Sequence, residues 1–388
     1  MIDTIRYGFI GCGMMGQEHL RNLALVSGSV VTRIFEPDDG MAARSLALAP
    51  GARRAGRLEE VVQAEDVDAL VVTSPNFRHA EQLQRIAALR GLPVLLEKPA
   101  CTDLAQVGAL RALARTHPAP LWVAMEYRYM PPIARLIDEI RAGQTTGPLA
   151  MLSLREHRFP FLVKVGDWNR FNRYTGGTLV EKCCHFFDLM RLIAGCAPVR
   201  VYASGTAAHN HLDERYADGV PDILDHAYVI VDFASGLRAM LELCMFAEGS
   251  RYQEEISAVG PTGKVECFVP GPQRFWPAHL GEPPTPRLVL SPRNPKGPVE
   301  LEVPVDPTAL AAGDHNGSTL VQHQRFRAAV LGRGPVEVTL DDGLDAVLLG
   351  LAAQASARTG QAIDLRSGPY AIGGSAAAID STAAQSSA

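Results

Sequence analysis

The fold of the first part of the chain is decided by residues 5–19, IRYGFIGCGMMGQEH. An apolar run of β type leads into the pattern Gly-x-Gly-x-x-Gly, and a helical pattern follows. In such a turn the first glycine permits a tight bend, the second lets a pyrophosphate approach the backbone, and the third lets the helix pack on the strand. The start of the helix offers free N–H groups to the phosphates. We therefore expect this turn to hold a dinucleotide, with contacts at Gly11, Gly13, Met14, Met15 and Gly16.

An acidic residue at the end of the second expected strand bears on the choice of nucleotide. Glu36 follows the run Val30–Phe35 and lies 25 residues after Gly11. A carboxylate at this place binds the two hydroxyls of the adenine ribose and repels a 2′-phosphate, which favours NAD. Arg33 and Arg44 keep NADP open as the less favoured alternative.

Short β-type runs alternate with helical patterns over roughly the first 125 residues, which predicts βαβ units and a parallel sheet. The expected strands are Ile5–Ile10, Val30–Phe35, Ala69–Val72, Pro93–Leu96 and Leu121–Ala124. The expected helices are 16–26, 41–48, 78–90 and 102–114, the last capped by Thr102.

The pattern changes after Met130. Longer β-type runs follow at 149–156, 199–207, 226–233, 237–246, 251–259 and 264–269, with a hairpin turn at 234–236. They predict a mixed or antiparallel sheet. Expected helices are 131–141, 178–194, 318–331 and 340–358, the last with a Thr339–Asp342 capping box. Residues 270–307 hold 11 of the 27 prolines, which favours an extended insertion with edge strands.

The composition is that of a globular protein. Of the 388 residues, 47% are hydrophobic and 20% charged, which excludes a disordered or fibrous chain. The net charge of −5 disfavours nucleic acid and anionic membranes as partners. No apolar run approaches the roughly 20 residues that span a bilayer, and no signal-peptide pattern is found. Seven scattered cysteines without a CxxC pair predict reduced thiols and a cytoplasmic location.

A lysine stands at the carboxyl end of the fourth expected strand, in Glu97-Lys98-Pro99. Open α/β sheets bind ligands at that edge. A lysine there can accept or donate a proton if burial and neighbours lower its pKa. On the tripeptide alone, a surface lysine at a strand end is the simpler interpretation.

Three polar residues share one face of the expected helix 178–194. Glu181, His185 and Asp188 are spaced by four and three residues, which suits proton transfer or the binding of hydroxyls. A core histidine satisfied by a carboxylate is an equally good interpretation. A metal site formed with the two cysteines before His185 is disfavoured, because adjacent helical residues point about 100° apart. No metal is therefore expected.

Two further segments carry groups suited to a polyhydroxylated ligand. The segment 166–173 combines an aromatic ring, amides and guanidinium groups, with Trp168, Asn169 and Arg170 as the expected contacts. A structured loop anchored by a buried tryptophan is the alternative. His315, shortly before an expected helix, either reaches a substrate or faces water.

Taken together, the motifs resemble those of the Gfo/Idh/MocA oxidoreductase family, from about residue 5 to residue 365. The matching segments follow the family's order: Gly11–Gly16, Glu36-Pro37-Asp38, Thr73-Ser74-Pro75-Asn76 with His79-Ala80-Glu81, Glu97-Lys98-Pro99, Gly176-Gly177 with His185 and Asp188, and Gly317-Ser318-Thr319 with His323.

The resemblance implies a Rossmann fold first and an open, mostly antiparallel sheet second, with one sheet face behind the active site and the other often in oligomer contacts. The Lys98–Pro99 bond is often cis in the family. Lys98 would transfer the proton, His185 would hold the reacting hydroxyl, and Glu181 would orient the imidazole. Inositol dehydrogenases of the family usually carry Asp in place of Glu181.

The full set of expected site residues follows from the motifs and the resemblance. Beyond the glycine turn, the expected cofactor contacts are Glu36, Ser74, Pro75, Asn76, His79, Glu97 and Lys98. The expected substrate contacts are Lys98, Arg128, Trp168, Asn169, Arg170, Glu181, His185 and His315.

We predict an NAD-dependent dehydrogenase of a sugar or cyclitol. The NAD-binding domain is placed at 1–127, a substrate-binding and oligomerisation domain of α+β type at 128–366, and a mobile tail of Gly, Ala and Ser at 367–388. The expected partner is a small polyol, and a homodimer or homotetramer forms through the second sheet. The alternatives are a sugar-modifying enzyme that uses bound NAD transiently, a biosynthetic keto- or imino-sugar reductase, and a non-catalytic NAD-binding regulator.

Overall fold

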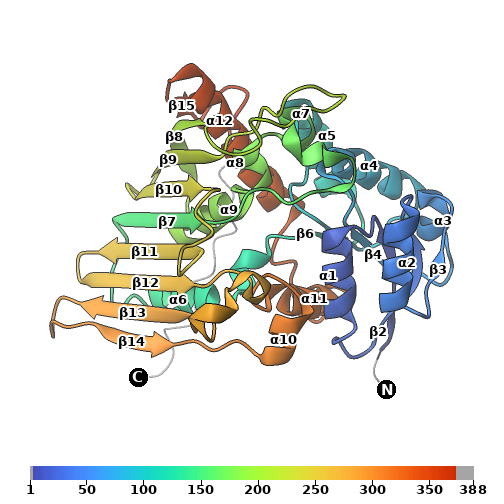
Figure 1. Ribbon diagram of the computed structural model, residues 1–388, viewed down its shortest axis with the longest axis horizontal. Coiled ribbons are helices and arrows are strands. Elements are labelled where there is room, and N and C mark those ends of the chain that lie inside the picture. Colours follow the sequence, from blue (N-terminus) through green and yellow to red (C-terminus); the bar gives the residue numbers. More distant parts are fainter. Residues whose placement is uncertain (1–2, 373–388) are drawn as a thin grey trace.

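The computed structural model describes residues 3–372, so the part of the predicted tail at 373–388 lies outside the described residues. The chain forms two β-sheets, a smaller one at the right of Figure 1 and a larger one at the left. Between them the chain passes through the short 3-10 helix η2 (Glu126–Tyr129). The domain boundary that we propose, between residues 127 and 128, falls within η2.

The first sheet has six strands in the order β3-β2-β1-β4-β5-β6, and every neighbouring pair is parallel. Its strands are β1 (Ile5–Ile10), β2 (Ser29–Phe35), β3 (Arg53–Arg54), β4 (Ala69–Val72), β5 (Val94–Leu96) and β6 (Leu121–Val123). This confirms the predicted Rossmann sheet. The winding reverses between β1 and β4, and ligands of such sheets bind beyond the carboxyl ends of the strands at that point.

Five helices connect these strands: α1 (Met14–Leu23), α2 (Asp39–Leu48), α3 (Leu58–Val62), α4 (His79–Leu89) and α5 (Leu104–Thr116). The sequence predicted all but α3. The predicted cap of α5 is wrong by one residue, because the carboxylate of Asp103, not Thr102, accepts the N–H of Ala105. Asp103 has the extended backbone that turns a capping side chain toward the first free N–H groups.

The second sheet has nine strands in the order β14-β13-β12-β11-β7-β10-β9-β8-β15. Their bounds are β7 (Met151–His157), β8 (Pro198–Thr206), β9 (His226–Phe233), β10 (Arg238–Cys244), β11 (Glu254–Gly260), β12 (Gly263–Val269), β13 (Arg287–Pro292), β14 (Val299–Glu302) and β15 (Ile363–Asp364). Only β7 and β10 pair in parallel, so the sheet is mostly antiparallel, as predicted.

The proline-rich segment supplies the edge of this sheet. The strands β13 and β14 lie outermost, where a missing backbone N–H costs no ladder hydrogen bond. This confirms the expected edge strands. The same segment also contains two short 3-10 helices, η4 (Gln273–Phe275) and η5 (Ala278–Leu280), which the sequence did not predict.

The longer helices of the second part are α6 (Pro131–Ala142), α9 (Cys184–Ala194), α11 (Ser318–Val330) and α12 (Leu340–Thr359), with a short α10 (Pro307–Ala312). The predicted capping box of α12 is present, since Thr339 and Asp342 each bond the other's backbone N–H. Within residues 3–372 we find no helix with both the length and the apolar character needed to cross a bilayer.

The predicted helix 178–194 is wrong in one respect that matters for the site. Two helices, α8 (Thr178–Glu181) and α9 (Cys184–Ala194), are separated by Lys182 and Cys183. A short α7 (Asn172–Thr175) precedes them, ending at Gly176 with a φ of +78°. Lys182 and Cys183 keep right-handed helical dihedral angles, so the break interrupts the helix without reversing the chain.

Candidate active site

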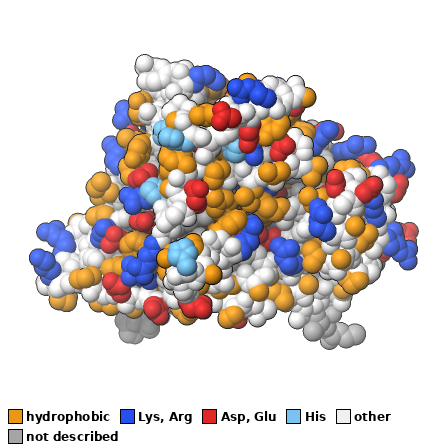
Figure 2. Space-filling view, in the orientation of Figure 1, with side chains coloured by type: hydrophobic (Ala, Val, Ile, Leu, Met, Phe, Trp, Pro, Cys, Tyr) orange, Lys and Arg blue, Asp and Glu red, His pale blue; other side chains and the backbone are white. Residues whose placement is uncertain are grey.

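A cavity of about 1090 Å³ opens at the carboxyl edge of the first sheet. Its lining comes from the segments after β1, β2, β4, β5 and β6, and from the second part of the chain through residues such as Arg158, Trp168 and Gln253. The lining combines apolar, cationic and anionic side chains. On the face of the molecule in Figure 2, hydrophobic side chains gather near the centre with Lys and Arg side chains beside them.

The glycine turn joins β1 to α1, and Gly11, Gly13, Met14 and Met15 line the cavity, whereas Gly16 packs against Thr73 and is absent from the lining. Gly11 has a φ of +81°, and a Cβ there would come within 2.5 Å of the backbone nitrogen of Ser74. A Cβ on Gly13 would meet nothing within 4 Å. Among the described residues no side chain caps α1, so its first N–H groups remain available to a ligand. Room and donors together fit the pyrophosphate of a dinucleotide.

Glu36 is held rigidly at the end of β2. Its Oε2 accepts the backbone N–H of Cys12 at 2.6 Å, and its Oε1 accepts that of Asp38 at 2.9 Å. The side chain is buried yet borders the cavity. The carboxylate therefore ties the glycine turn to the second strand and places a negative charge beside the site.

The loop after β4 also lines the cavity, through Ser74, Pro75 and Asn76, so their expected contacts with the cofactor stay predictions. His79 borders it too, but its ring nitrogens lie 2.8 Å from the carbonyl oxygens of Pro99 and Ser74. Both nitrogens are thus occupied. His79 therefore links two loops beside the cavity, and its expected contact with the cofactor stays a prediction.

Lys98 enters the cavity from the loop after β5, and its Nζ donates to the carbonyl oxygen of Glu181 at 2.9 Å. The Lys98–Pro99 bond is cis, as the resemblance implied. Burial alone would lower the pKa of Lys98, but the surrounding negative groups, Glu181 foremost, outweigh it and raise that pKa above its ordinary value. Lys98 is therefore an ammonium donor near neutral pH, and its pKa is not lowered as the sequence analysis considered.

Glu97 lies beside this lysine and is held by a histidine of α1. Its Oε1 lies 2.8 Å from Nε2 of His19, and both side chains are buried. Glu97 borders the cavity, as predicted. Burial alone would raise the pKa of Glu97, but His19 outweighs it and lowers that pKa.

His185 lines the same cavity from α9. Its ring stacks on Tyr127, with centroids 4.2 Å apart and planes at 6°. Its Nε2 lies 3.7 Å from Oε1 of Glu126. Burial, followed by the charges of Lys98 and Lys182, lowers the pKa of His185 well below its ordinary value. The imidazole is therefore neutral near pH 7 and can accept a proton.

Glu181 does not orient this imidazole, contrary to the expectation. The carboxylate that lies near Nε2 of His185 is that of Glu126, at 3.7 Å. The carboxylate of Glu181 instead accepts a hydrogen bond from the side-chain amide of Asn76. Glu181 does line the cavity, so its expected place at the site stands as a prediction.

Two expected substrate contacts are absent from the cavity lining. The guanidinium of Arg128 forms a buried ion pair with Asp188. Arg170 is 2% exposed, and its Nε lies 2.8 Å from Glu214. Because both guanidinium groups are already engaged by carboxylates, they hold the protein together, which corrects the expected substrate contacts. Sequence position alone did not reveal these partners.

Three other expected substrate contacts do line the cavity: Trp168, Asn169 and His315. The ring of Trp168 packs edge-on against Phe77, with centroids 6.2 Å apart. The amide of Asn169 donates to a carbonyl of its own loop at 2.9 Å. Nδ1 of His315 lies 2.7 Å from Oε1 of Glu18.

Sequence reasoning missed a group of charged side chains in the lining: Glu126, Arg158, Lys164, Lys182 and Glu254. Nζ of Lys182 lies 2.8 Å from Glu156 and donates to the hydroxyl of Tyr127 at 2.5 Å. One signal was available for Glu126, which follows β6 at the ligand-binding edge of the sheet. Arg158, Lys164 and Glu254 come from segments without a motif, whereas Lys182 lies between Glu181 and His185 in a segment that the sequence analysis singled out.

In the described part of the chain, no three His, Cys, Asp or Glu side chains come together as a metal site requires. All seven cysteines carry free thiols, five of them buried. The pKa of the Cys184 thiol is raised to about 12, mainly by burial. A thiol in that state is a poor metal ligand or nucleophile.

Two descriptions of one protein family match the chain. "Oxidoreductase family, NAD-binding Rossmann fold" matches residues 5–125, and "Oxidoreductase family, C-terminal alpha/beta domain" matches residues 143–365. The chain belongs to the Gfo/Idh/MocA oxidoreductase family. This Gfo/Idh/MocA protein is therefore an NAD-binding oxidoreductase, and the resemblance stated from the motifs is confirmed.

Characterised relatives of this Gfo/Idh/MocA protein cover about 70% of its length. Rhizopine catabolism protein MocA of Rhizobium meliloti is 28% identical over 71% of this chain and 80% of its own. Inositol 2-dehydrogenase of Corynebacterium glutamicum strain R is 30% identical over 71% of this chain and 77% of its own.

Solved structures share the fold over nearly the whole chain. Levoglucosan dehydrogenase in complex with NADH and levoglucosan superposes with a TM-score of 0.77 at 19% identity, covering 93% of this chain and 99% of that one. GenD2 from gentamicin A biosynthesis, in complex with NAD, superposes with a TM-score of 0.76 at 21% identity, covering 95% of this chain and 98% of that one.

Proposed function

We propose that this oxidoreductase transfers a hydride between a secondary hydroxyl of a sugar or cyclitol and NAD. The observation that carries the proposal is that Lys98 and His185 line the same cavity as the glycine turn. One is an ammonium donor and the other a neutral ring. That pair suits a hydroxyl that loses its proton while its carbon loses a hydride. Relatives named inositol 2-dehydrogenase and levoglucosan dehydrogenase support a polyol.

Each residue has a defined part in this proposal. NAD supplies the hydride acceptor when bound. Lys98 donates a hydrogen bond to the reacting oxygen and stabilises the negative charge that develops there. His185 accepts the hydroxyl proton. Trp168 and Asn169 border the same space and are placed to contact the rest of the polyol.

The proposed preference for NAD over NADP rests on Glu36. Its carboxylate is fixed by two backbone N–H groups at the edge of the cavity, so it cannot easily swing away from a 2′-phosphate. Arg57 also lines the cavity, and its Nε lies 3.2 Å from Glu60. That ion pair partly neutralises the positive charge of Arg57.

We also propose that copies of the chain associate through the second sheet. Four neighbouring strands expose large apolar side chains: Met151, Tyr202, Tyr228, Ile230 and Met240. Ile230 pairs with Met240 on one side and with Tyr202 on the other, which makes a continuous row. Apolar rows of this kind on a surface mark protein interfaces. Light scattering should show a dimer or tetramer, and a smaller species for Ile230→Glu.

The test of the function is a substrate panel. Inositols, aldoses, their epimers and the matching sugar acids are incubated with NAD, and the absorbance of reduced nicotinamide is followed. The acids are included because Arg158 and Lys164 line the cavity. Formation of NADH with at least one polyol supports the proposal. Turnover of a sugar without net NADH would favour transient redox, and activity only toward keto-sugars would favour a reductase.

A further inference from the structure

Glu126 is a buried carboxyl at the centre of the cavity's polar lining. It is 1% exposed and follows β6 as the first residue of η2. Its Oε1 lies 3.7 Å from Nε2 of His185 and 3.9 Å from Nε2 of His315. Its Oε2 has no hydrogen-bond partner among the described residues. A carboxyl kept only for structure would have both oxygens paired, because an unpaired buried oxygen costs about 1–3 kcal/mol.

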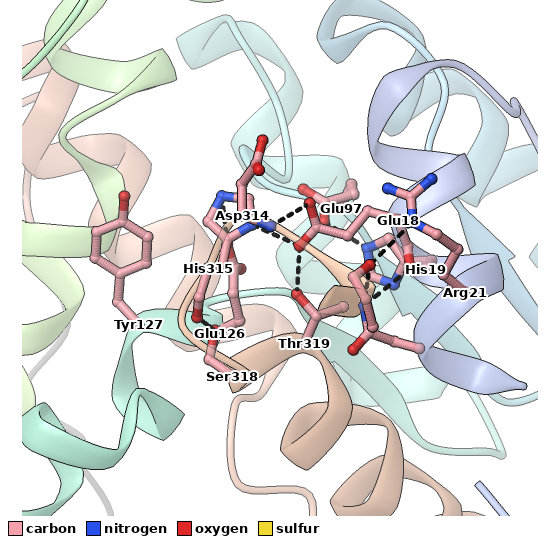
Figure 3. A network of polar contacts seen from close by, with 12 residues as sticks. Glu18, His19, Arg21, Glu97, Glu126, Tyr127, Asp314, His315, Ser318 and Thr319 are labelled. Atoms are coloured by element: carbon pink, nitrogen blue, oxygen red, sulfur yellow. Dashed lines mark hydrogen bonds and ion pairs between the residues drawn. The ribbon is translucent and has the colours of Figure 1, made fainter. Parts of the chain in front are cut away.

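His315, the second histidine near Glu126, is also in contact with a carboxylate on the cofactor side of the cavity, Glu18. Nδ1 of His315 lies 2.7 Å from Oε1 of Glu18, on the helix that follows the glycine turn. Glu18 is held in turn by the hydroxyl of Thr319 at 3.0 Å and the backbone N–H of Asp314 at 3.2 Å. Figure 3 shows Glu126 and His315 side by side, with Glu18 beyond them. The polar atoms form a row: His185, Glu126, His315, Glu18.

The pKa values of Glu126 and His315 are both raised, and the two groups titrate at different pH. Burial, followed by Glu97, raises the pKa of Glu126 to about 7, although His315 and Lys98 oppose the rise. Burial would lower the pKa of His315, but Glu18 outweighs it and raises the value to about 9. Near neutral pH, His315 is therefore charged, and Glu126 can both hold and release a proton.

We propose that Glu126 and His315 form a proton relay that serves His185. The relay rests on the proposed function, since it carries away the proton that a polyol releases. Glu126 acts through His185 and is a positioning and relay residue. It takes the place beside the imidazole that the sequence had led us to expect for Glu181.

The O–H bond of the substrate breaks and its proton goes to Nε2 of His185, while the hydride of the same carbon goes to NAD and a carbonyl forms. The imidazolium proton then passes to the carboxylate of Glu126. His315, whose side chain is 21% exposed, passes a proton to water and is reprotonated from Glu126. The net products are ketone, NADH and one proton.

The charged and titratable groups facing Glu126 come from several elements. They are Glu97 and Lys98 after β5, Cys184 and His185 on α9, and His315 before α11. The Cys184 thiol stays protonated, and Lys98 stays charged, across neutral pH. Glu126 and Glu254 are then the two carboxyls of the cavity whose pKa is raised to about 7, and a titration near pH 7 belongs to Glu126 if Glu126→Gln removes it and Glu254→Gln keeps it.

The kinetic test compares two buried carboxyls of the same cavity. Glu254 is also 1% exposed with a pKa raised to about 7, mainly by burial and then by Glu156, but it lies beside Lys182. We expect kcat/KM for the polyol, at saturating NAD, to rise with pH through about 7. Glu126→Gln should remove this rise and lower kcat roughly 10- to 100-fold. Glu126→Asp should restore part of the pH-dependent rise in kcat/KM and part of the lost kcat. Glu254→Gln should keep the pH-dependent rise.

A second readout needs neither cofactor nor turnover. In protein labelled with ¹³C-histidine, the ring titration of His315, assigned with His315→Gln, is followed by NMR without NAD. Glu126→Gln should lower the pKa of His315 by roughly one unit, because it loses a carboxylate 3.9 Å away. Glu254→Gln should leave that titration unchanged. An unchanged titration in Glu126→Gln would overturn the coupling.

The outcomes separate the relay from the proposed function. An active wild type whose Glu126→Gln variant keeps the pH rise overturns the relay and leaves the function standing. A wild type that reduces no NAD with any polyol overturns the function, and the NMR shift then decides the coupling. If Glu126→Gln fails to fold, His315→Gln takes its place, with an expected loss of kcat and an unchanged KM.

Discussion

The two ends of the cavity are built in different ways. At the cofactor end, Glu36 has each carboxylate oxygen bonded to a backbone N–H, and the glycine turn leaves an open space at Gly13. At the substrate end, Glu126 and His185 are side chains from distant segments, and each keeps a buried polar atom without a partner among the described residues. The carboxylate at the cofactor end has its hydrogen bonds before any ligand arrives, whereas the two side chains at the substrate end each keep an unpaired polar atom.

This difference suggests how each end works. The cofactor end is a preformed cradle, in which backbone N–H groups and empty space await a phosphate. The substrate end holds unpaired groups in a poorly solvated site, where their interactions with a reacting hydroxyl are strong. Substitutions at the first end should therefore change binding, and those at the second should change turnover. Substitutions outside both ends should change stability alone.

The largest expected effect concerns a residue of neither end. Arg128→Met leaves the carboxylate of Asp188 buried without its partner. The free energy of unfolding should fall by about 3–5 kcal/mol, as measured by urea denaturation. The folded fraction should keep its kcat/KM. Normal stability with a large loss of kcat/KM would restore Arg128 as a substrate contact.

At the substrate end, Lys98→Met removes the ammonium donor. We expect kcat to fall roughly 100-fold, while the affinity for NADH, followed by its fluorescence, changes little. Because the pKa of Lys98 is raised, the lysine keeps its proton through neutral pH, and the rise in wild-type activity near pH 7 must have another origin. A rise that appears only above pH 9 would return Lys98 to the role of base.

At the cofactor end, Gly13→Ala adds a methyl group where the chain leaves empty space. The melting temperature should stay near that of the wild type, and the affinity for NAD should fall about tenfold or more, or about 1.4 kcal/mol. Calorimetric titration measures the affinity. The matched control is Gly11→Ala, which should lose stability, because its Cβ would lie 2.5 Å from the Ser74 nitrogen at a φ of +81°.

The smallest effect concerns the choice of cofactor. The wild type should use NAD at least about tenfold better than NADP in kcat/KM, and Glu36→Ala should narrow that ratio. Asp39→Ala removes a nearby carboxylate that is absent from the cavity lining and should keep the ratio. Equal use of both cofactors by the wild type would contradict the role given to Glu36.

Local patterns in the sequence were enough for the cofactor end and for the class of each sheet. The strand, turn and helix of residues 5–23 are contiguous, so spacing alone predicted them, and the capping box of α12 was found for the same reason. Alternating burial in β11 and β12 likewise follows from a two-residue period. Such features depend on interactions within one segment.

Which side chains meet at the substrate end could be learned from the tertiary structure alone. Glu181 accepts a hydrogen bond from Asn76, and Glu126, from another segment, lies beside His185. Which carboxylate meets which imidazole or guanidinium depends on how separate elements pack, and a single sequence carries no periodic signal for that. The sequence determined which groups the site contains; the packing of η2, α9 and the loop before α11 decided which of them meet.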